Sequence, residues 1–251
     1  MRHLLSAEGT ASLTTQILRK PLLAFDFDGT LAPIVSRPDD ARVSMPVARR
    51  LKALSAHLSI AIISGRSVDD VLGRLQFEPA YVIGNHGAED PAMPPDQDHA
   101  QVLDGFRMRL KGARVLLDQV GVVVEDKGAS LALHYRLARD RHAASNAIAG
   151  LLARLDPGLK AFGGKFVVNV VSKSAHDKAQ ALATLVSRCQ VDCAVFVGDD
   201  INDEPVFARH DPNWLTVRVG RDDANSQAQF FIDSVSEMPA MLDLMLAALS
   251  S

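Results

Sequence analysis

The stretch Leu22-Leu23-Ala24-Phe25-Asp26-Phe27-Asp28-Gly29-Thr30-Leu31 decides how this chain folds. Its nearly unbroken apolar residues are typical of a strand that is buried on both faces in a parallel sheet. Side chains alternate along a strand, so Asp26 and Asp28 leave it on the same side if the chain stays extended. Two carboxylates at a buried strand end need a cation, and Mg²⁺ binds such carboxylates together with phosphate oxygens. Gly29 permits a sharp turn, after which Thr30 offers a hydroxyl and an amide to an anion.

Length and composition are those of an ordinary globular protein. The 251 residues are 47% hydrophobic and 23% charged, which is enough for one large domain or two smaller ones. A net charge of −3 gives no general affinity for nucleic acid or for an anionic membrane surface. The sequence shows neither a membrane-spanning apolar run nor a convincing signal peptide. We therefore expect a cytoplasmic monomer, with Cys189 and Cys193 as free thiols because no second Cys/His pair accompanies them.

Strands and helices alternate on both sides of the central part of the chain. Apolar runs predict strands over 59–63, 80–83, 194–197 and 215–219. Helices are expected over about 12–18, 46–57, 67–75, 176–189 and 238–249. This alternation indicates an α/β protein with a doubly wound, Rossmann-like core, whose chemistry lies at the carboxyl ends of parallel strands.

The pattern changes in the middle of the chain, after a proline-rich break at 91–95. A helical stretch from about 98 to 120 leads into a β-hairpin around Lys127-Gly128. A helix over about 139–155 follows, and then a second hairpin that is expected to turn at Gly163-Gly164. We therefore predict that residues 1–96 and 172–251 form the core, and that residues 97–171 form an inserted α+β cap domain.

Four polar groups follow the strands or open the helices of the predicted core. They are Asp26 with Asp28, Ser64 in Ser64-Gly65-Arg66, Lys178, and Asp199 with Asp200 and Asp203. A serine before a helix offers a hydroxyl and amides to an anion, and a lysine adds an ammonium. Alone, the acids could cap the next segment and the lysine could be a solvated helix residue. Together, in this order at one sheet edge, they favour a site for phosphate and Mg²⁺.

These motifs resemble those of the haloacid dehalogenase superfamily of phosphohydrolases. Its pattern is D-x-D-G-T, a Ser or Thr after the second strand, a Lys, and G-D-D-x-x-D, and all four occur here in order between residues 22 and about 219. Finer features are similar to those of trehalose-6-phosphate phosphatases. They are Ser-Gly-Arg at 64–66, Gly-Asn-His-Gly-Ala-Glu at 84–89, the hairpin at 124–136, and Gly-Asp-Asp-x-x-Asp-Glu at 198–204.

The resemblance implies a Mg²⁺-dependent phosphatase that hydrolyses trehalose 6-phosphate to trehalose and phosphate. Phosphate monoesters need roughly 20 kcal/mol or more of barrier lowering, which covalent catalysis divides into two steps. Asp26 is expected as the nucleophile and Asp28 as the general acid and base, while Ser64 and Lys178 bear phosphoryl charge. The expected metal ligands are Asp26, Asp28 through its carbonyl, and Asp199, with Asp200 or Asp203 close by.

In this family the cap grips the disaccharide. The substrate-binding residues that the resemblance implies are Thr30, Gly65, Arg66, Asn85 and His86 in the core, and Glu125, Lys127, Arg136, Lys165 and Asn169 in the cap. Asn169 stands where the family has Glu, and Asn202 stands where it usually has Thr. Asn169 keeps hydrogen-bonding ability but lacks the charge of a glutamate, which bears on one sugar contact.

Three other functions remain open at this point. A phosphatase of the sucrose phosphate or mannosylglycerate phosphate type would share the core motifs and differ only in the cap. A non-catalytic sugar-phosphate-binding regulator would lack the nucleophile or the acid–base, whereas Asp26 and Asp28 are both present. A phosphomutase would return the phosphoryl group to its substrate, so the accumulation of inorganic phosphate separates it from a phosphatase.

Overall fold

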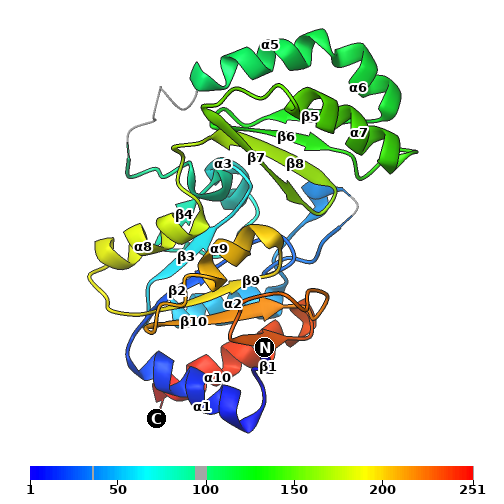
Figure 1. The fold of residues 1–251 in the computed structure, drawn as a ribbon. Helices are drawn as coiled ribbons and strands as arrows, with labels where there is room; N and C mark the ends of the chain where they lie inside the picture. Colours follow the sequence, from blue (N-terminus) through cyan, green and yellow to red (C-terminus); the bar gives the residue numbers. More distant parts are fainter. Residues whose placement is uncertain (36, 94–100, 251) are drawn as a thin grey trace. The chain divides into compact units, whose positions relative to one another are not determined.

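A computed structural model describes residues 1–35, 37–93 and 101–250 and shows two compact units (Figure 1). The first unit comprises Met1–Asp90 and Asp177–Ser251, and the second comprises Pro91–His176. The residue pair 96/97, at which the sequence placed the first domain boundary, lies outside the described residues. Among the helices of the described ranges, none is both long and apolar enough to cross a membrane.

The first unit is built on a seven-stranded sheet with all pairs parallel. Its order is β1 (Arg2–His3), β11 (Phe230–Ile232), β10 (Trp214–Val219), β9 (Ala194–Gly198), β2 (Leu22–Phe25), β3 (Ile60–Ile63) and β4 (Tyr81–Ile83). The predicted doubly wound parallel sheet is therefore confirmed. The sequence analysis missed β1 and β11, because strands of two and three residues are too short to show a period.

Strand β2 lies inside the sheet, between β9 and β3, and its side chains alternate between two cores. Leu23 and Phe25 pack in one core with residues of α1 (Ala7–Leu18), α2 (Met45–Leu54), α3 (Val68–Leu72) and α10 (Met238–Ser250). Leu22 and Ala24 pack in the other core with α8 (Lys178–Arg188) and α9 (Glu204–Phe207). Helices on both faces explain why this strand is an unbroken apolar run.

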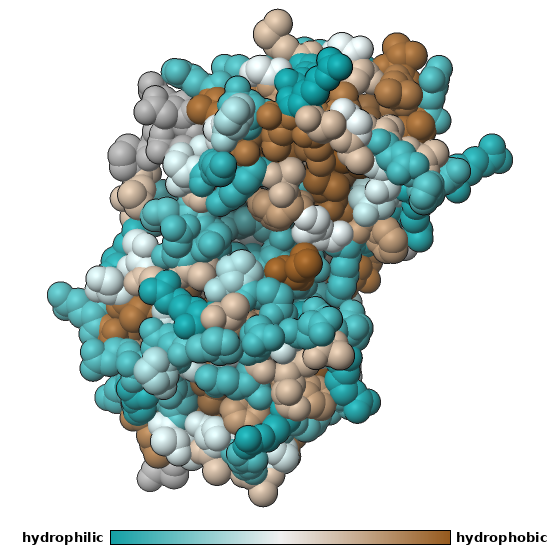
Figure 2. All heavy atoms as spheres, viewed as in Figure 1, coloured by the Kyte–Doolittle hydropathy of each residue, from teal (hydrophilic) through white to brown (hydrophobic). Residues whose placement is uncertain are grey.

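The second unit is an antiparallel sheet of order β5-β6-β8-β7 with helices on one face (Figure 1). Its strands are β5 (Val123–Asp126), β6 (Ser130–His134), β7 (Leu159–Gly164) and β8 (Val167–Ser172), and its helices are α5 (Asp104–Gly112), α6 (Arg114–Val120) and α7 (Arg141–Leu152). Leu131, Leu133 and Val170 pack in one core with residues of the three helices. The apolar surface in Figure 2 gathers mainly over this unit, where Met108, Leu137 and other large apolar side chains are exposed.

Two expectations for the second unit need correction. The second hairpin turns at Lys165-Phe166 and not at Gly163-Gly164, because both glycines pair with β8 and Phe166 takes the left-handed turn conformation (φ 63°). The predicted long helix is interrupted at Ala113, where the backbone leaves helical geometry between α5 and α6. The predicted start of that helix at 98 and the end of the 91–95 break lie outside the described residues.

Candidate active site

The polar groups that the sequence singled out in the core follow the carboxyl ends of neighbouring strands in the first unit. Asp26 follows β2, Ser64 follows β3, Asn85 follows β4 and Asp199 follows β9, and these strands are adjacent in the sheet. We call this region the carboxyl edge. Parallel strands bring their carboxyl ends to one edge, so residues far apart in the sequence meet there.

Lys178 joins two carboxylates at the carboxyl edge. Its Nζ donates to Oδ1 of Asp26 at 2.7 Å and to Oδ1 of Asp203 at 2.7 Å. All three side chains are buried, Asp203 completely. The lysine is the first residue of α8, whose N-terminus is fixed by a capping box between Asp177 and Gln180. The helix start thus sets the position of the ammonium group.

Asp203 also shapes the loop after β9. Its Oδ2 accepts hydrogen bonds from the backbone N–H groups of Asp199 at 2.9 Å and Asp200 at 3.0 Å. The carboxylate of Asp200 points elsewhere, because it accepts from Ile201 N–H and caps a short 3₁₀ helix over Ile201–Asp203. The structure therefore brings Asp203, and not Asp200, together with Asp26 and Asp199.

Asp26, Asp199 and Asp203 suit a divalent cation. One oxygen of each lies within 4.8 Å of the others, and all three residues are buried. Burial raises the pKa of Asp26 well above its usual range, and Asp203 and Asp199 raise it further, against the opposing effect of Lys178. Burial would lower the pKa of Lys178, but Asp203 and Asp26 raise it above its ordinary value. One ammonium does not balance three carboxylates, so the donor set fits a hard cation such as Mg²⁺.

Two glycines make room for these carboxylates. A Cβ atom at Gly29 would overlap the carboxylate of Asp199, and Gly29 also has a φ of 85° that side chains disfavour. A Cβ atom at Gly198 would overlap the carboxylate of Asp203. Thr30 Oγ1 lies 3.5 Å from Asp199 Oδ1, at the limit of a hydrogen bond. Gly29 is thus explained by close packing against an acid of the second aspartate motif, and Gly198 by close packing against the last acid of its own motif.

Asp28 lies apart from the three clustered carboxylates. Strand β2 ends at Phe25, and the chain then turns so that Phe27 O accepts from Leu31 N–H at 3.0 Å. The sequence analysis expected Asp26 and Asp28 on the same side of an extended strand. Because the chain turns after Phe25, that expectation does not hold for Asp28. Its two carboxylate oxygens instead bind the guanidinium of Arg66, with distances of 2.6 Å from Nε and 2.7 Å from Nη2.

The loops after β3 and β4 are bonded to each other. Ser64 is buried, its Oγ accepts from Arg66 N–H at 3.1 Å, and its carbonyl accepts from His86 N–H at 2.8 Å. Asn85 and His86 both have positive φ angles, 50° and 60°. A Cβ atom at Gly65 would overlap the His86 ring. Such strained backbone is kept only where surrounding contacts determine it, and it is common at functional sites.

The sequence analysis did not assign a role to Glu89, which holds this strained loop. Its Oε2 accepts from Asn85 Nδ2 at 2.7 Å and from Val68 N–H at 3.1 Å, so it ties the loop to the start of α3. The only sequence signal was its place at the end of the quoted Gly-Asn-His-Gly-Ala-Glu segment. From the sequence alone, a carboxylate in that position is indistinguishable from an exposed loop residue, because its partners Asn85 and Val68 are seen only in the fold.

The residues expected to bind sugar in the second unit lie on the sheet face opposite its helices and at the adjoining hairpin ends. Strand register places Glu125, Ala132, Asn169 and Phe162 in one row across β5, β6, β8 and β7. We call this the polar sheet face. Glu125 Oε2 lies 2.8 Å from His134 Nε2 and 3.6 Å from Lys127 Nζ.

At the hairpin ends, Arg136 Nη2 donates to the backbone oxygen of Lys165 at 3.2 Å. His134 and Phe162 were not among the sequence candidates. Their alternation with Leu133 and Ala161 along the strands could have indicated that they share a face with Glu125 and Asn169.

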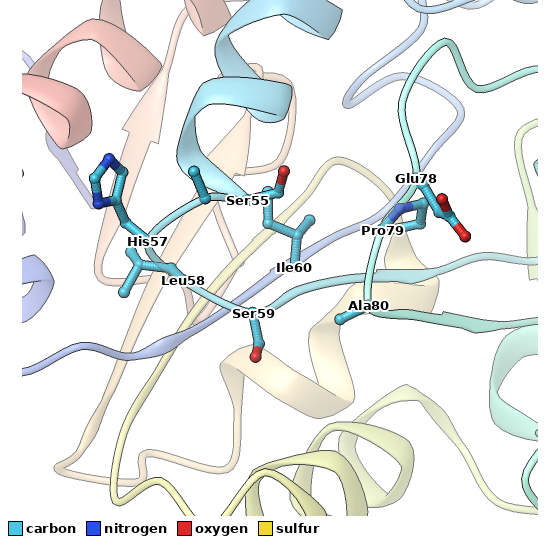
Figure 3. Close-up of a pocket in the computed structure, with 9 residues that line it drawn as sticks. Ser55, His57, Leu58, Ser59, Ile60, Glu78, Pro79 and Ala80 are labelled. Atoms are coloured by element: carbon cyan, nitrogen blue, oxygen red, sulfur yellow. The ribbon is translucent and has the colours of Figure 1, made fainter.

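A surface pocket of about 610 Å³ lies elsewhere in the first unit (Figure 3). It is lined by residues 55–60 and 78–80, where the chain enters β3 and β4. This is the amino-terminal end of the strands, opposite the carboxyl edge. The pocket therefore has no part in the chemistry of Asp26 and Lys178.

The chain has a doubly wound parallel sheet with an Asp–Lys–Asp cluster at its carboxyl edge, and its fold is similar to that of solved phosphatases of the haloacid dehalogenase superfamily. In fold, the chain is similar to a phosphatase of that superfamily from Bacteroides thetaiotaomicron, with a TM-score of 0.59, 20% identity, and coverage of 89% of this chain and 93% of that one. It is also similar to the C-terminal domain of C. albicans trehalose-6-phosphate phosphatase, with a TM-score of 0.79, 20% identity, and coverage of 95% and 96%.

The chain belongs to the trehalose-phosphatase family, whose model matches residues 24–236. It is 35% identical over 226 residues to trehalose-phosphate phosphatase of Mycobacterium leprae, covering 82% of this chain and 52% of that protein. It is 34% identical over 205 residues to an uncharacterized glycosyl hydrolase of Mycobacterium tuberculosis, covering 75% of this chain and 15% of that protein. The family resemblance seen in the sequence is confirmed, and the chain spans only part of these relatives.

Proposed function

We propose that this chain is a Mg²⁺-dependent phosphatase that hydrolyses trehalose 6-phosphate to trehalose and inorganic phosphate. The observation that carries the proposal is the buried contact of Lys178 with Asp26 and Asp203 beside Asp199, in a chain of the trehalose-phosphatase family. A buried, partly neutralised set of carboxylates is costly to maintain for stability alone. It suits a reaction that brings both a cation and a phosphate dianion to the same edge.

In the proposed first step, Asp26 attacks phosphorus. Lys178 donates to Oδ1 of Asp26, and we assign Oδ2 as the attacking oxygen. As the phosphorus–sugar oxygen bond breaks, Asp28 gives a proton to the leaving oxygen, which yields free sugar and an aspartyl-phosphate. Such proton transfer typically contributes about 10²–10⁴-fold to the rate.

In the second step, Asp28 removes a proton from water, whose oxygen attacks phosphorus and releases phosphate from Asp26. Lys178 and Ser64 would stabilise the charge on the phosphoryl oxygens in both steps. Asp26, Asp199 and Asp203, with the Asp28 carbonyl, would hold Mg²⁺, which supplies further neutralisation of that charge when bound. Asp203 keeps Lys178 in place, since it accepts from the same ammonium.

For sugar recognition, we assign residues 97–171 as a cap domain that uses the polar sheet face. Glu125, Lys127 and Asn169 offer charged and amide groups of the kind that pair with sugar hydroxyls. Arg136 and Lys165 adjoin each other at the hairpin ends and add two cationic side chains. A site that hydrogen-bonds hydroxyl groups discriminates strongly against analogues that lack them.

A second candidate is a phosphatase for another sugar phosphate, of the sucrose or mannosylglycerate type. The observation that favours it is Asn169, a neutral side chain in the centre of the polar sheet face where the family has Glu. A non-catalytic regulator is disfavoured, because Asp26, Asp28 and Lys178 are all present and Lys178 contacts Asp26.

Phosphate release from a panel of sugar phosphates, with Mg²⁺ and with EDTA, tests the proposed function. We expect the highest kcat/KM for trehalose 6-phosphate and loss of activity in EDTA. Faster turnover of sucrose or mannosylglycerate phosphate would establish the second candidate. Absence of phosphate release from every member of the panel would contradict both.

A further inference from the structure

Arg66 has little capacity left for a substrate. Nε and Nη2 donate to the two oxygens of Asp28, Nη1 donates to Asp70 Oδ2 at 2.6 Å, and Nη2 also donates to Pro38 O at 2.9 Å. A guanidinium has five N–H donors, and these bonds use four of them. The side chain is 10% exposed, and its guanidinium carbon lies over the ring of Phe27, 5.5 Å from the ring centroid. The guanidinium is therefore committed to protein groups.

Resting on the function proposed above, we propose that Arg66 is a positioning residue for Asp28 and not a sugar ligand. Its fork holds both oxygens of Asp28 in one orientation. An oxygen of Asp28 must leave one of these N–H groups before it can exchange a proton with the sugar oxygen or with water. Arg66 would thus set the resting position from which Asp28 reaches the reacting atoms.

A second arginine helps to fix the guanidinium of Arg66 that binds Asp28. Asp70 binds Arg66 through Oδ2 and accepts from Arg74 through Oδ1, with distances of 2.9 Å from Nε and 2.5 Å from Nη2. Arg74 is also buried and donates to the backbone oxygens of Pro38 and Asp39. Asp70 and Arg74 therefore fix Arg66 through Nη1, the guanidinium nitrogen that does not contact Asp28, and charge-assisted hydrogen bonds of this kind fix geometry as well as adding stability.

A double-mutant cycle between Arg66 and Asp28 tests the proposal. We expect R66Q to lower kcat for the best sugar phosphate by about 10–100-fold, because misplaced catalytic groups cost rates of that order. KM should stay within about threefold, since no ground-state contact is lost. In a D28N background, R66Q should lower kcat by less than about twofold, because residues that act as a unit are not additive.

Arg50 provides the matched control. It makes the same two-point pair with Asp243 between α2 and α10, through Nε at 2.7 Å and Nη2 at 2.8 Å. R50Q should leave kcat and KM unchanged. D70N, which keeps the fork but removes one acceptor behind it, serves as a second variant if R66Q does not fold. D70N alone should lower kcat relative to the wild-type enzyme, and the double variant D70N/D28N should have the same kcat as D28N.

Three results would overturn the positioning role. They are multiplied kcat losses in R66Q/D28N, a rise in KM with unchanged kcat in R66Q, and an R66Q enzyme indistinguishable from R50Q. All variants are compared on the phosphate monoester that the wild type hydrolyses fastest. The test therefore depends only on ratios of kcat and KM between variants and not on which substrate this is. The identity of that substrate is decided separately, by the wild-type panel, and the two failures are distinguishable.

Discussion

The carboxyl edge of the first unit and the polar sheet face of the second unit hold similar polar residues in different surroundings. At the carboxyl edge, Lys178 and Asp203 are buried and contact each other at 2.7 Å. On the polar sheet face, the side chain of Glu125 is half exposed, and its Oε2 lies 3.6 Å from Lys127 Nζ. Buried ion pairs tolerate little change, whereas exposed ones contribute little stability and can be exchanged.

The difference suggests a division of labour. Chemistry on phosphate needs groups fixed to within fractions of an ångström, so it benefits from a buried and strained setting. Recognition of a sugar depends on the pattern of hydroxyl partners, which can change one residue at a time. Asn169, which stands where the sequence resemblance implies Glu, lies on the polar sheet face, whereas the D-x-D-G-T and G-D-D-x-x-D motifs are both present at the carboxyl edge.

The largest effect is expected from Asp26→Asn. The change is nearly isosteric but removes the nucleophile, so phosphate release should fall by more than about 10⁴-fold, because no covalent intermediate can form. Thermal unfolding should show a folded protein, since Lys178 retains Asp203 as a partner. A variant that keeps even a tenth of the wild-type rate would disprove the nucleophile assignment.

Lys178→Met should affect both stability and activity. Removing the ammonium leaves Asp26 and Asp203 without their shared partner, which typically costs about 3–5 kcal/mol of unfolding free energy. Urea unfolding in EDTA measures this loss, and Mg²⁺ should restore part of it because a ligand of the native state stabilises it. Lys52→Met, at an exposed position of α2, is the control. Equal stability of the two variants would contradict the role of Lys178.

The strands that end at the carboxyl edge could be predicted from the sequence because both of their faces are buried. Strands β2, β3 and β9 are covered by helices on both faces, so each is a short apolar run followed by a polar group. The two-residue strand β1 and the three-residue β11 gave no such signal. Within the second unit, the turn at Lys165-Phe166 was missed because adjacent glycines are the stronger turn signal, although here they are paired in a strand.

The partners of the acidic groups could not be predicted, because they depend on contacts between distant segments. Arg66 is 38 positions from Asp28, and only the folded sheet shows that its guanidinium binds that carboxylate. The choice between Asp200 and Asp203 was likewise open, since both follow β9. It depends on a loop geometry in which Asp203 turns back to accept two backbone N–H groups.

A smaller effect is expected from Glu125→Gln on the polar sheet face. Loss of the charge that faces His134 and Lys127 should raise KM for trehalose 6-phosphate by about tenfold, the scale of the net contribution of one hydrogen bond. KM for p-nitrophenyl phosphate, which has no sugar, should not change. Asp118→Asn, an exposed acid on α6, is the control. Equal effects of Glu125→Gln on both substrates would argue against a sugar-binding role for this face.

The smallest effect is expected from Asp126→Asn, beside the same hairpin. Hydrogen bonds from Arg107 hold the pKa of Asp126 below its usual value of 3.8, against the effect of burial. The ionised form is thus favoured in the folded state, and its stabilisation is present above pH 4 and lost as the pH falls through the lowered pKa. Because the side chain is 48% exposed, the loss at pH 7 should be at most about 1 kcal/mol.

Amide hydrogen exchange of β5 and β6 in Asp126→Asn measures this loss within the second unit, independently of the first. Protection of these strands should fall at pH 7, and the difference from the wild type should shrink as the pH falls through the lowered pKa of Asp126 and the wild-type carboxylate becomes protonated as well. Protection that stays lower than wild type by the same factor as the pH falls would show that shape, and not charge, stabilises the hairpin. Asp126 pairs with Leu131 on the helix side of the sheet, so such a result would assign the stability of the hairpin to its packing against Arg107 of α5. At the carboxyl edge, by contrast, the charges themselves are held by fixed partners.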